Sequence, residues 1–123
     1  MAPIKTDLVA KTLSASDAEL FANLGSRAYI SEGRLIHKRS AQDPNDEENG
    51  KKIFAFILPE LRHVICDDWQ ACQRMNKYPD ELALAAAISD TIVTTKVIPL
   101  PAVTLAVLAV RIGVKRLCNC HGS

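Results

Sequence analysis

The stretch PELRHVICDDWQACQRMN, residues 59–76, carries the strongest helical signal in the chain. Its apolar side chains recur at a period of 3.6 residues, at positions 61, 64, 65, 69, 72 and 75. Proline is tolerated as the first residue of a helix, because the amide hydrogen that it lacks has no intrahelical partner there. We therefore predict a helix over 59–76 that begins at Pro59.

Two further helices are predicted downstream. The first covers 79–95, where Pro79 is followed by Asp80 and Glu81 near the positive end of the helix dipole. The second covers 101–118, where basic residues lie near the negative end. Three separate helical periods predict that the C-terminal part is the most regular part of the chain.

Upstream of 59 the sequence is more varied. The run IFAFIL, residues 53–58, fits either a short buried strand or the start of a helix, because periodicity cannot separate the two. Residues 40–50 are rich in turn formers and predict a polar loop. Ser16 and Glu19 have the spacing of a capping box, which predicts a helix with apolar positions 20, 21, 24 and 28.

Together these elements predict an all-α fold, a bundle of about four to five helices, with one short strand near 53–58 as an open alternative. We expect a single domain over 1–123, made of an N-terminal helical part (1–39), the polar loop (40–50) and a C-terminal helical core (51–123). The residues expected to be mostly buried are Leu61, Ile65, Cys72, Leu82, Ala86, Val93, Val103, Val107, Val110 and Val114.

Composition and the absence of known motifs argue against several classes of function. Fifteen basic and fourteen acidic residues leave a formal charge of +1, and aromatic residues make up 5% of the chain, so nothing supports a nucleic-acid partner. No secretory signal or membrane span is evident, and we expect a cytoplasmic protein. Glycine-rich phosphate loops and common hydrolase motifs are absent from the sequence, so we expect no cofactor and no enzymatic activity.

The four cysteines suggest an alternative function, zinc binding or thiol chemistry. In a reducing compartment they are expected to be free thiols, and Cys118, Cys120 and His121 then suggest a small zinc-binding protein. On a continuous helix Cys66 and Cys72 would point to different faces. His63 lies three residues before Cys66, which suggests thiol-dependent chemistry with nearby histidines.

Asp67 and Asp68 are the other candidate pair for chemistry. Adjacent positions on an α-helix diverge by about 100°, so these carboxylates are not expected to face one target.

The final predicted helix has apolar residues on two sides. Val103, Val107 and Val114 share one side, whereas Leu105, Leu108 and Ile112 lie on nearly the opposite side. Either the helix is central and covered all round, or the second side binds another chain. For Trp69 the alternatives are a core position and an interface anchor. The candidate interface is Trp69, Leu105, Leu108, Arg111, Ile112 and Lys115.

Two segments carry a resemblance to known proteins. CDDWQAC (66–72), together with PLP (99–101) before an apolar helix that ends RIGVKRLC (111–118), is similar to small helical adaptor or effector-associated domains of bacterial conflict and defence systems. The resemblance implies protein partners and self-association, and it assigns no site residues. We therefore predict a non-enzymatic interaction or assembly module, an adaptor or small subunit that binds a protein partner or forms a homo-oligomer.

Overall fold

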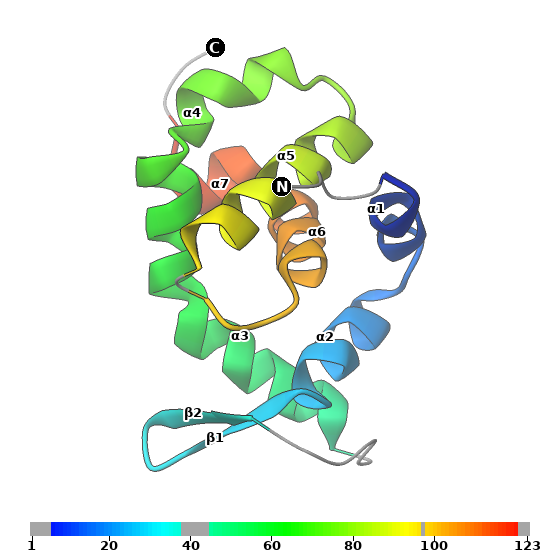
Figure 1. Ribbon diagram of the computed structural model, residues 1–123, viewed down its shortest axis with the longest axis vertical. Coiled ribbons are helices and arrows are strands. Elements are labelled where there is room, and N and C mark those ends of the chain that lie inside the picture. The colour runs from blue at the N-terminus through cyan, green and yellow to red at the C-terminus, as the bar shows by residue number, and fades with distance from the viewer. Residues whose placement is uncertain (1–5, 38–44, 97, 121–123) are drawn as a thin grey trace. The chain divides into compact units, whose positions relative to one another are not determined.

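The computed structural model describes residues 6–37, 45–96 and 98–120. Of the described residues 73% are helical, and they form seven α-helices and one antiparallel pair of strands (Figure 1). This confirms the predicted all-α class. The chain divides into two compact units, unit 1 (Met1–Ser14 and Pro59–Ser123) and unit 2 (Ala15–Leu58). One boundary lies between Ser14 and Ala15, and the other lies between Leu58 and Pro59, inside the helix Asp46–Arg62.

Unit 1 is built around one apolar helix. This helix, α6 (Ala102–Ile112), packs against α1, α5 and α7, and seven successive residues from Val103 to Ala109 are buried (Figure 1). A helix that is apolar on every side is stable only when it is covered on every side. The other elements of unit 1 are α1 (Thr6–Leu13), the end of α3 (Asp46–Arg62), the π-helix η1 (His63–Asp68), α4 (Ala71–Arg74), the 3-10 helix η2 (Met75–Lys77), α5 (Glu81–Thr95) and α7 (Val114–Cys118).

The predicted core of unit 1 is partly correct. Five of its members are buried, namely Leu61, Ile65, Val103, Val107 and Val114, and four are half-buried, namely Cys72, Leu82, Ala86 and Val110. The prediction that Val93 is buried was wrong, because its side chain is 37% exposed. The buried positions of α5 are 84, 85, 88, 89 and 92. An alanine-rich helix presents apolar surface on several faces, so the sequence did not fix which face would turn inward.

The predicted helix over 59–76 does not exist as one helix. Pro59 lies inside α3, which begins at Asp46, and so Pro59 is not a first residue. The run 53–58 is helical and not a strand, since Ile53, Phe54, Ile57 and Leu61 are buried at helical spacing. Downstream, Gln70 adopts a left-handed backbone (φ 57°) and separates η1 from α4. Similarly, Gly113 (φ 101°) divides the predicted helix over 101–118 into α6 and α7.

Unit 2 begins with the predicted capping box. The Ser16 hydroxyl accepts a hydrogen bond from the Glu19 amide, and the Glu19 side chain accepts one from the Ser16 amide. The helix that follows, α2, spans Asp17–Gly25. We had expected helical structure as far as Ala28, but that residue opens a hairpin.

The hairpin pairs β1 (Ala28–Ser31) with β2 (Arg34–His37), Tyr29 lying opposite Ile36 and Ser31 opposite Arg34. Its turn residues Glu32 and Gly33 both have positive φ, the backbone that a two-residue hairpin loop requires. The purely helical prediction for 1–39 was therefore wrong at these positions.

The helices α2 and α3 cross at two glycines in unit 2. A side-chain carbon added to Gly25 would overlap the Asp46 carbonyl group, and one added to Gly50 would overlap the Phe21 carbonyl group. Phe21 and Phe54 also meet edge to face, with ring centres 6.0 Å apart. The start of α3 at Asp46 corrects the loop prediction for 46–50, while positions 40–44 lie outside the described residues.

Candidate functional site

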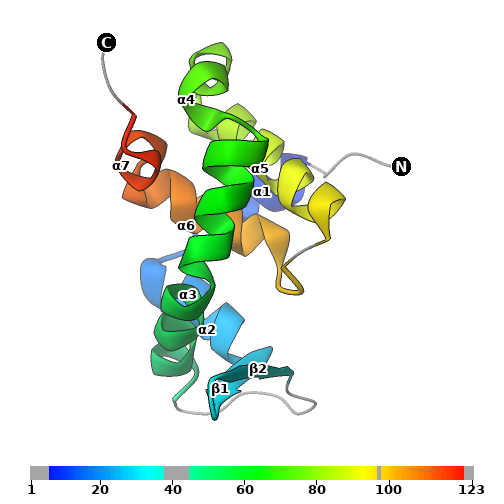
Figure 2. The ribbon, with the colours of Figure 1, turned by 90° about the vertical axis from the view of Figure 1, so that its left-hand side faces the viewer.

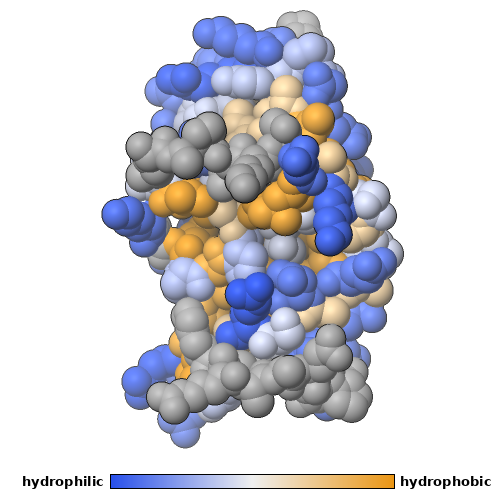
Figure 3. Space-filling model, turned by 45° about the vertical axis from the view of Figure 1, so that its right-hand side comes forward, coloured by the Kyte–Doolittle hydropathy of each residue, from blue (hydrophilic) through white to orange (hydrophobic). Residues whose placement is uncertain are grey.

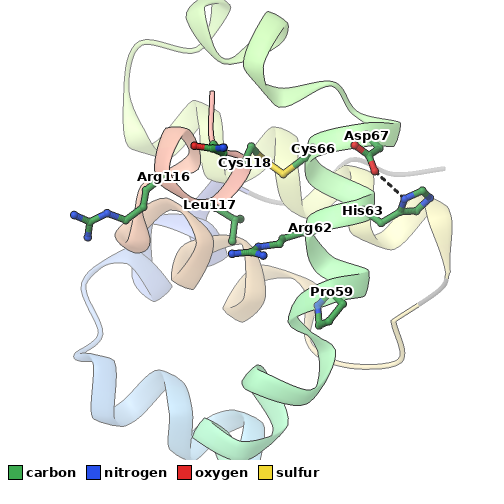
Figure 4. A pocket seen from close by; sticks show the side chains of 9 residues that line it. Pro59, Arg62, His63, Cys66, Asp67, Arg116, Leu117 and Cys118 are labelled. Carbon is green, nitrogen blue, oxygen red and sulfur yellow. Dashed lines mark hydrogen bonds and ion pairs between the residues drawn. A yellow bond between two sulfur atoms is a disulfide. The ribbon is translucent and has the colours of Figure 1, made fainter. Parts of the chain in front are cut away.

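Two disulfides join the end of the described chain to the middle of unit 1. Cys66 is bonded to Cys118 (Figure 4), and Cys72 is bonded to Cys120. No free cysteine occurs among residues 6–37, 45–96 and 98–120, so the predicted free thiols were wrong. Because Gln70 interrupts the helix, Cys66 and Cys72 lie on separate elements, η1 and α4, and each reaches its own partner.

A local turn presents the two C-terminal cysteines. Asn119 has a left-handed backbone (φ 52°), which asparagine tolerates better than most residues. The Cys120 amide donates to the Lys115 carbonyl oxygen (2.9 Å), and the Asn119 amide donates to that of Arg116 (3.3 Å). These two bonds form a Schellman motif, the common way to end a helix. Cys118 is thus the last residue of α7, and Cys120 lies beyond it, bonded to Cys72 of α4. The helices α4 and α7 are in contact (Figure 2).

The π-helix η1 changes the geometry expected for the neighbouring aspartates. In a π-helix the hydrogen bonds join residues five apart, as from the Trp69 amide to the Val64 carbonyl oxygen (3.0 Å). His63 Nδ1 lies 3.0 Å from Asp67 Oδ2, and His63 Nε2 lies 3.6 Å from Asp68 Oδ1. Both carboxylates therefore face one imidazole, which corrects the prediction made for an α-helix. The three side chains are largely exposed, so these contacts stabilise the protein little.

An open pocket of about 600 Å³ lies in unit 1 beside the first disulfide (Figure 4). One wall comes from the end of α3 and from η1, and the other from α7 and the turn after it. The Cys66–Cys118 disulfide, Pro59 and Leu117 contribute its less polar lining. The polar lining consists of Arg62, His63, Asp67, Arg116 and Asn119.

The charged groups of the pocket differ in their partners. Asp67 is engaged by His63, as described above. The Arg62 and Arg116 side chains are exposed, and neither guanidinium group makes a hydrogen bond or ion pair within the part of the chain that the structure describes. Figure 4 shows Arg62 extending from α3 toward Leu117 of α7, whereas Arg116 extends outward from α7. The pocket therefore offers unpaired cationic groups and no unpaired carboxylate.

The predicted interface residues do not share one surface. Trp69, Leu105 and Leu108 are buried, and the Trp69 ring packs on Tyr78 with centres 5.7 Å apart. Thus the central-helix and core alternatives hold for these three residues. Arg111 Nη2 donates to the Leu13 carbonyl oxygen (2.7 Å) and fastens the end of α1. Only Ile112, Lys115 and Arg111 retain exposure.

The described residues contain no arrangement that fits the alternative prediction of zinc binding or thiol chemistry. In the described ranges no three His, Cys, Asp or Glu side chains come together to hold an ion, and His121 lies outside those ranges. The sulfur of Cys66, three residues after His63 in the sequence, is bonded to Cys118 and is not a thiol. Sequence reasoning had not selected Arg62, Arg116 or Asn119 as site residues. These residues lie far apart in the sequence, and knowledge of the Cys66–Cys118 pairing would have been needed to predict that they line one pocket.

Comparison with protein families, with curated proteins and with solved structures finds no match for this chain. Among the helices of the described residues, none is long and apolar enough to cross a membrane.

Proposed function

We propose that this chain is a non-enzymatic protein-binding module whose C-terminal unit is made rigid by two disulfides. The observation that carries the proposal is the use of all four cysteines in bonds that fasten 118–120 to η1 and α4. Cysteines held in this way contribute stability instead of nucleophilic or metal chemistry. A rigid surface loses less conformational entropy when it binds, which favours recognition.

The same bonds bear on the compartment. Disulfides form and persist in oxidising environments and are rare in the cytosol. We therefore propose that the protein works in an oxidising compartment, in place of the cytoplasmic location expected from the sequence.

Exposed apolar side chains support a protein partner. In unit 1 they are Leu8 on α1, Val93 on α5 and Ile112 on α6. Figure 3 shows apolar surface between hydrophilic side chains on one face of the molecule. The resemblance to adaptor and effector-associated domains of bacterial defence systems motivates the same class of function. Under this proposal the partner is another protein or a second copy of the chain.

An affinity experiment in the native host tests the proposal. The oxidised protein, immobilised on a support, should retain a defined partner from an extract prepared without reductant, and the purified partner should bind it directly. Protein that has been reduced and alkylated is the matched control, and it should lose the partner. Light scattering of the purified protein tests for a second copy. A strict monomer that retains no partner in its oxidised form would contradict the proposal.

A further inference from the structure

We propose that the pocket beside the Cys66–Cys118 disulfide binds the carboxylates of an acidic segment of a partner protein, with Arg62 as the main anchor. The inference rests on the proposed function and names the chemistry of the partner.

The first argument is the unused donor capacity of Arg62. A guanidinium group carries five N–H donors in a planar fork that matches the two oxygens of a carboxylate. Among the described residues Arg62 has no acceptor, and Figure 4 shows its side chain crossing toward α7 at Leu117. A carboxylate in the pocket would satisfy these donors with charge-assisted hydrogen bonds.

The second argument is the charge of the α7 side. Residues 102–120, which form α6, α7 and the turn after α7, contain Arg111, Lys115 and Arg116 and no acidic residue. The one carboxylate that lines the pocket, Asp67, faces His63. An anionic ligand therefore meets attraction on both walls and no unpaired negative group.

The third argument is preorganisation. Arg62 lies one turn before Cys66, and Arg116 lies two residues before Cys118. The disulfide between these cysteines ties the two walls together and so sets the spacing of the backbone positions from which the two arginine side chains extend. A fixed spacing reduces the entropy lost when both arginines engage one ligand.

A peptide fits this pocket better than a nucleic acid. The lining contains no Phe, Tyr or Trp on which bases could stack, and its cationic side chains are the two arginines alone. The less polar lining by Pro59, Leu117 and the disulfide instead offers contact to the aliphatic part of a glutamate side chain.

Fluorescence anisotropy with the oxidised full chain tests the inference. The probe is a short labelled peptide of alternating glutamate and glycine, and the same peptide with glutamine in place of glutamate is its control. We expect binding of the glutamate peptide only. Arg62→Gln should lower the affinity for the glutamate peptide about three- to fivefold, as expected for an exposed charge pair. Arg116→Gln should weaken it less, because that side chain points outward.

Arg74→Gln is the matched control variant, since Arg74 is exposed on α4 and does not line the pocket. It makes the same change of charge and should alter the affinity less than twofold. The inference is overturned if Arg62→Gln binds the peptide like wild type, if Arg74→Gln loses as much affinity, or if the glutamine peptide binds equally.

Two competitors separate other ligands from carboxylates. Inorganic phosphate that displaces the peptide at concentrations where free glutamate does not would identify a phosphate site and overturn the inference. A single-stranded RNA that binds more tightly than the peptide and depends on Arg62 would also overturn it. If the captured partner binds Arg62→Gln as well as it binds wild type, the pocket inference fails while the protein-binding function stands.

Discussion

Removing one disulfide should cost less stability than removing the second one afterwards, whichever of the two is removed first. They are interlocked, because the chain order of the cysteines is 66, 72, 118 and 120. Alone, each closes a loop, with sequence separations of 52 and 48. The entropy of closing such a loop stabilises the folded state by about 4 kcal/mol.

The second bond closes a much shorter loop once the first is present. Its path runs through 66–72, across the existing bond and through 118–120, about eight residues in all, so it adds about 2.5 kcal/mol. The pair together then contributes about 6.5 kcal/mol. Small domains are stable by about 5–15 kcal/mol, so the loss of both bonds removes a large part of the total.

Three variants measure these terms. The first replaces Cys66 and Cys118 by serine, the second replaces Cys72 and Cys120, and the third replaces all four. Urea unfolding can be followed by fluorescence of Trp69, the only tryptophan, which is buried in unit 1. We expect each paired variant to lose about 2.5 kcal/mol and the fourfold variant to lose about 6.5 kcal/mol or to be unfolded.

The decisive comparison is between the variant with all four cysteines replaced and the two paired variants. If the disulfides were independent, the decrease in the free energy of unfolding of the four-cysteine variant would equal the sum of the decreases in the two paired variants. That result would refute the interlocked arrangement. A fourfold variant within about 1 kcal/mol of wild type would refute the disulfides as the source of rigidity, because that difference is typical of an ordinary point mutation.

Other predictions concern the cysteines, the glycine crossing and the central helix. Alkylation of the denatured protein should modify no cysteine before reduction and four after it, as measured by mass spectrometry; any earlier labelling would contradict the pairing. Gly50→Ala should cost about 3 kcal/mol, because the added carbon meets the backbone of Phe21, which cannot rotate away. The control is Gly33→Ala, and both variants are measured by urea unfolding followed by circular dichroism. An added carbon at Gly33 meets open space, so this variant should lose only about 1 kcal/mol of stability, because of its positive φ. If Gly33→Ala is destabilised as much as Gly50→Ala, the steric explanation is wrong. Leu108→Glu should unfold unit 1, since the side chain is 3% exposed and the new carboxylate would have no partner; a folded variant in circular dichroism would show that α6 is not covered all round.

Local interactions determined several elements that the sequence alone predicted. The capping box at Ser16 and Glu19 starts α2 as expected, because both of its hydrogen bonds join residues three apart. The acidic start of α5 and the apolar character of α6 likewise depend on neighbouring residues. Helical class therefore followed from the sequence without knowledge of any distant contact.

Only the tertiary structure decided the arrangement around the pocket. The sequence allows three pairings of four cysteines, and the partners lie about fifty residues apart, so no local pattern selects Cys66 with Cys118. The break at Gln70 and the π-helix that precedes it also could not be predicted from periodicity, which reports the apolar pattern and not the backbone hydrogen bonds. Arg62 and Arg116 meet at one pocket because long-range bonds bring α7 to η1, and that packing is a property of the folded chain as a whole.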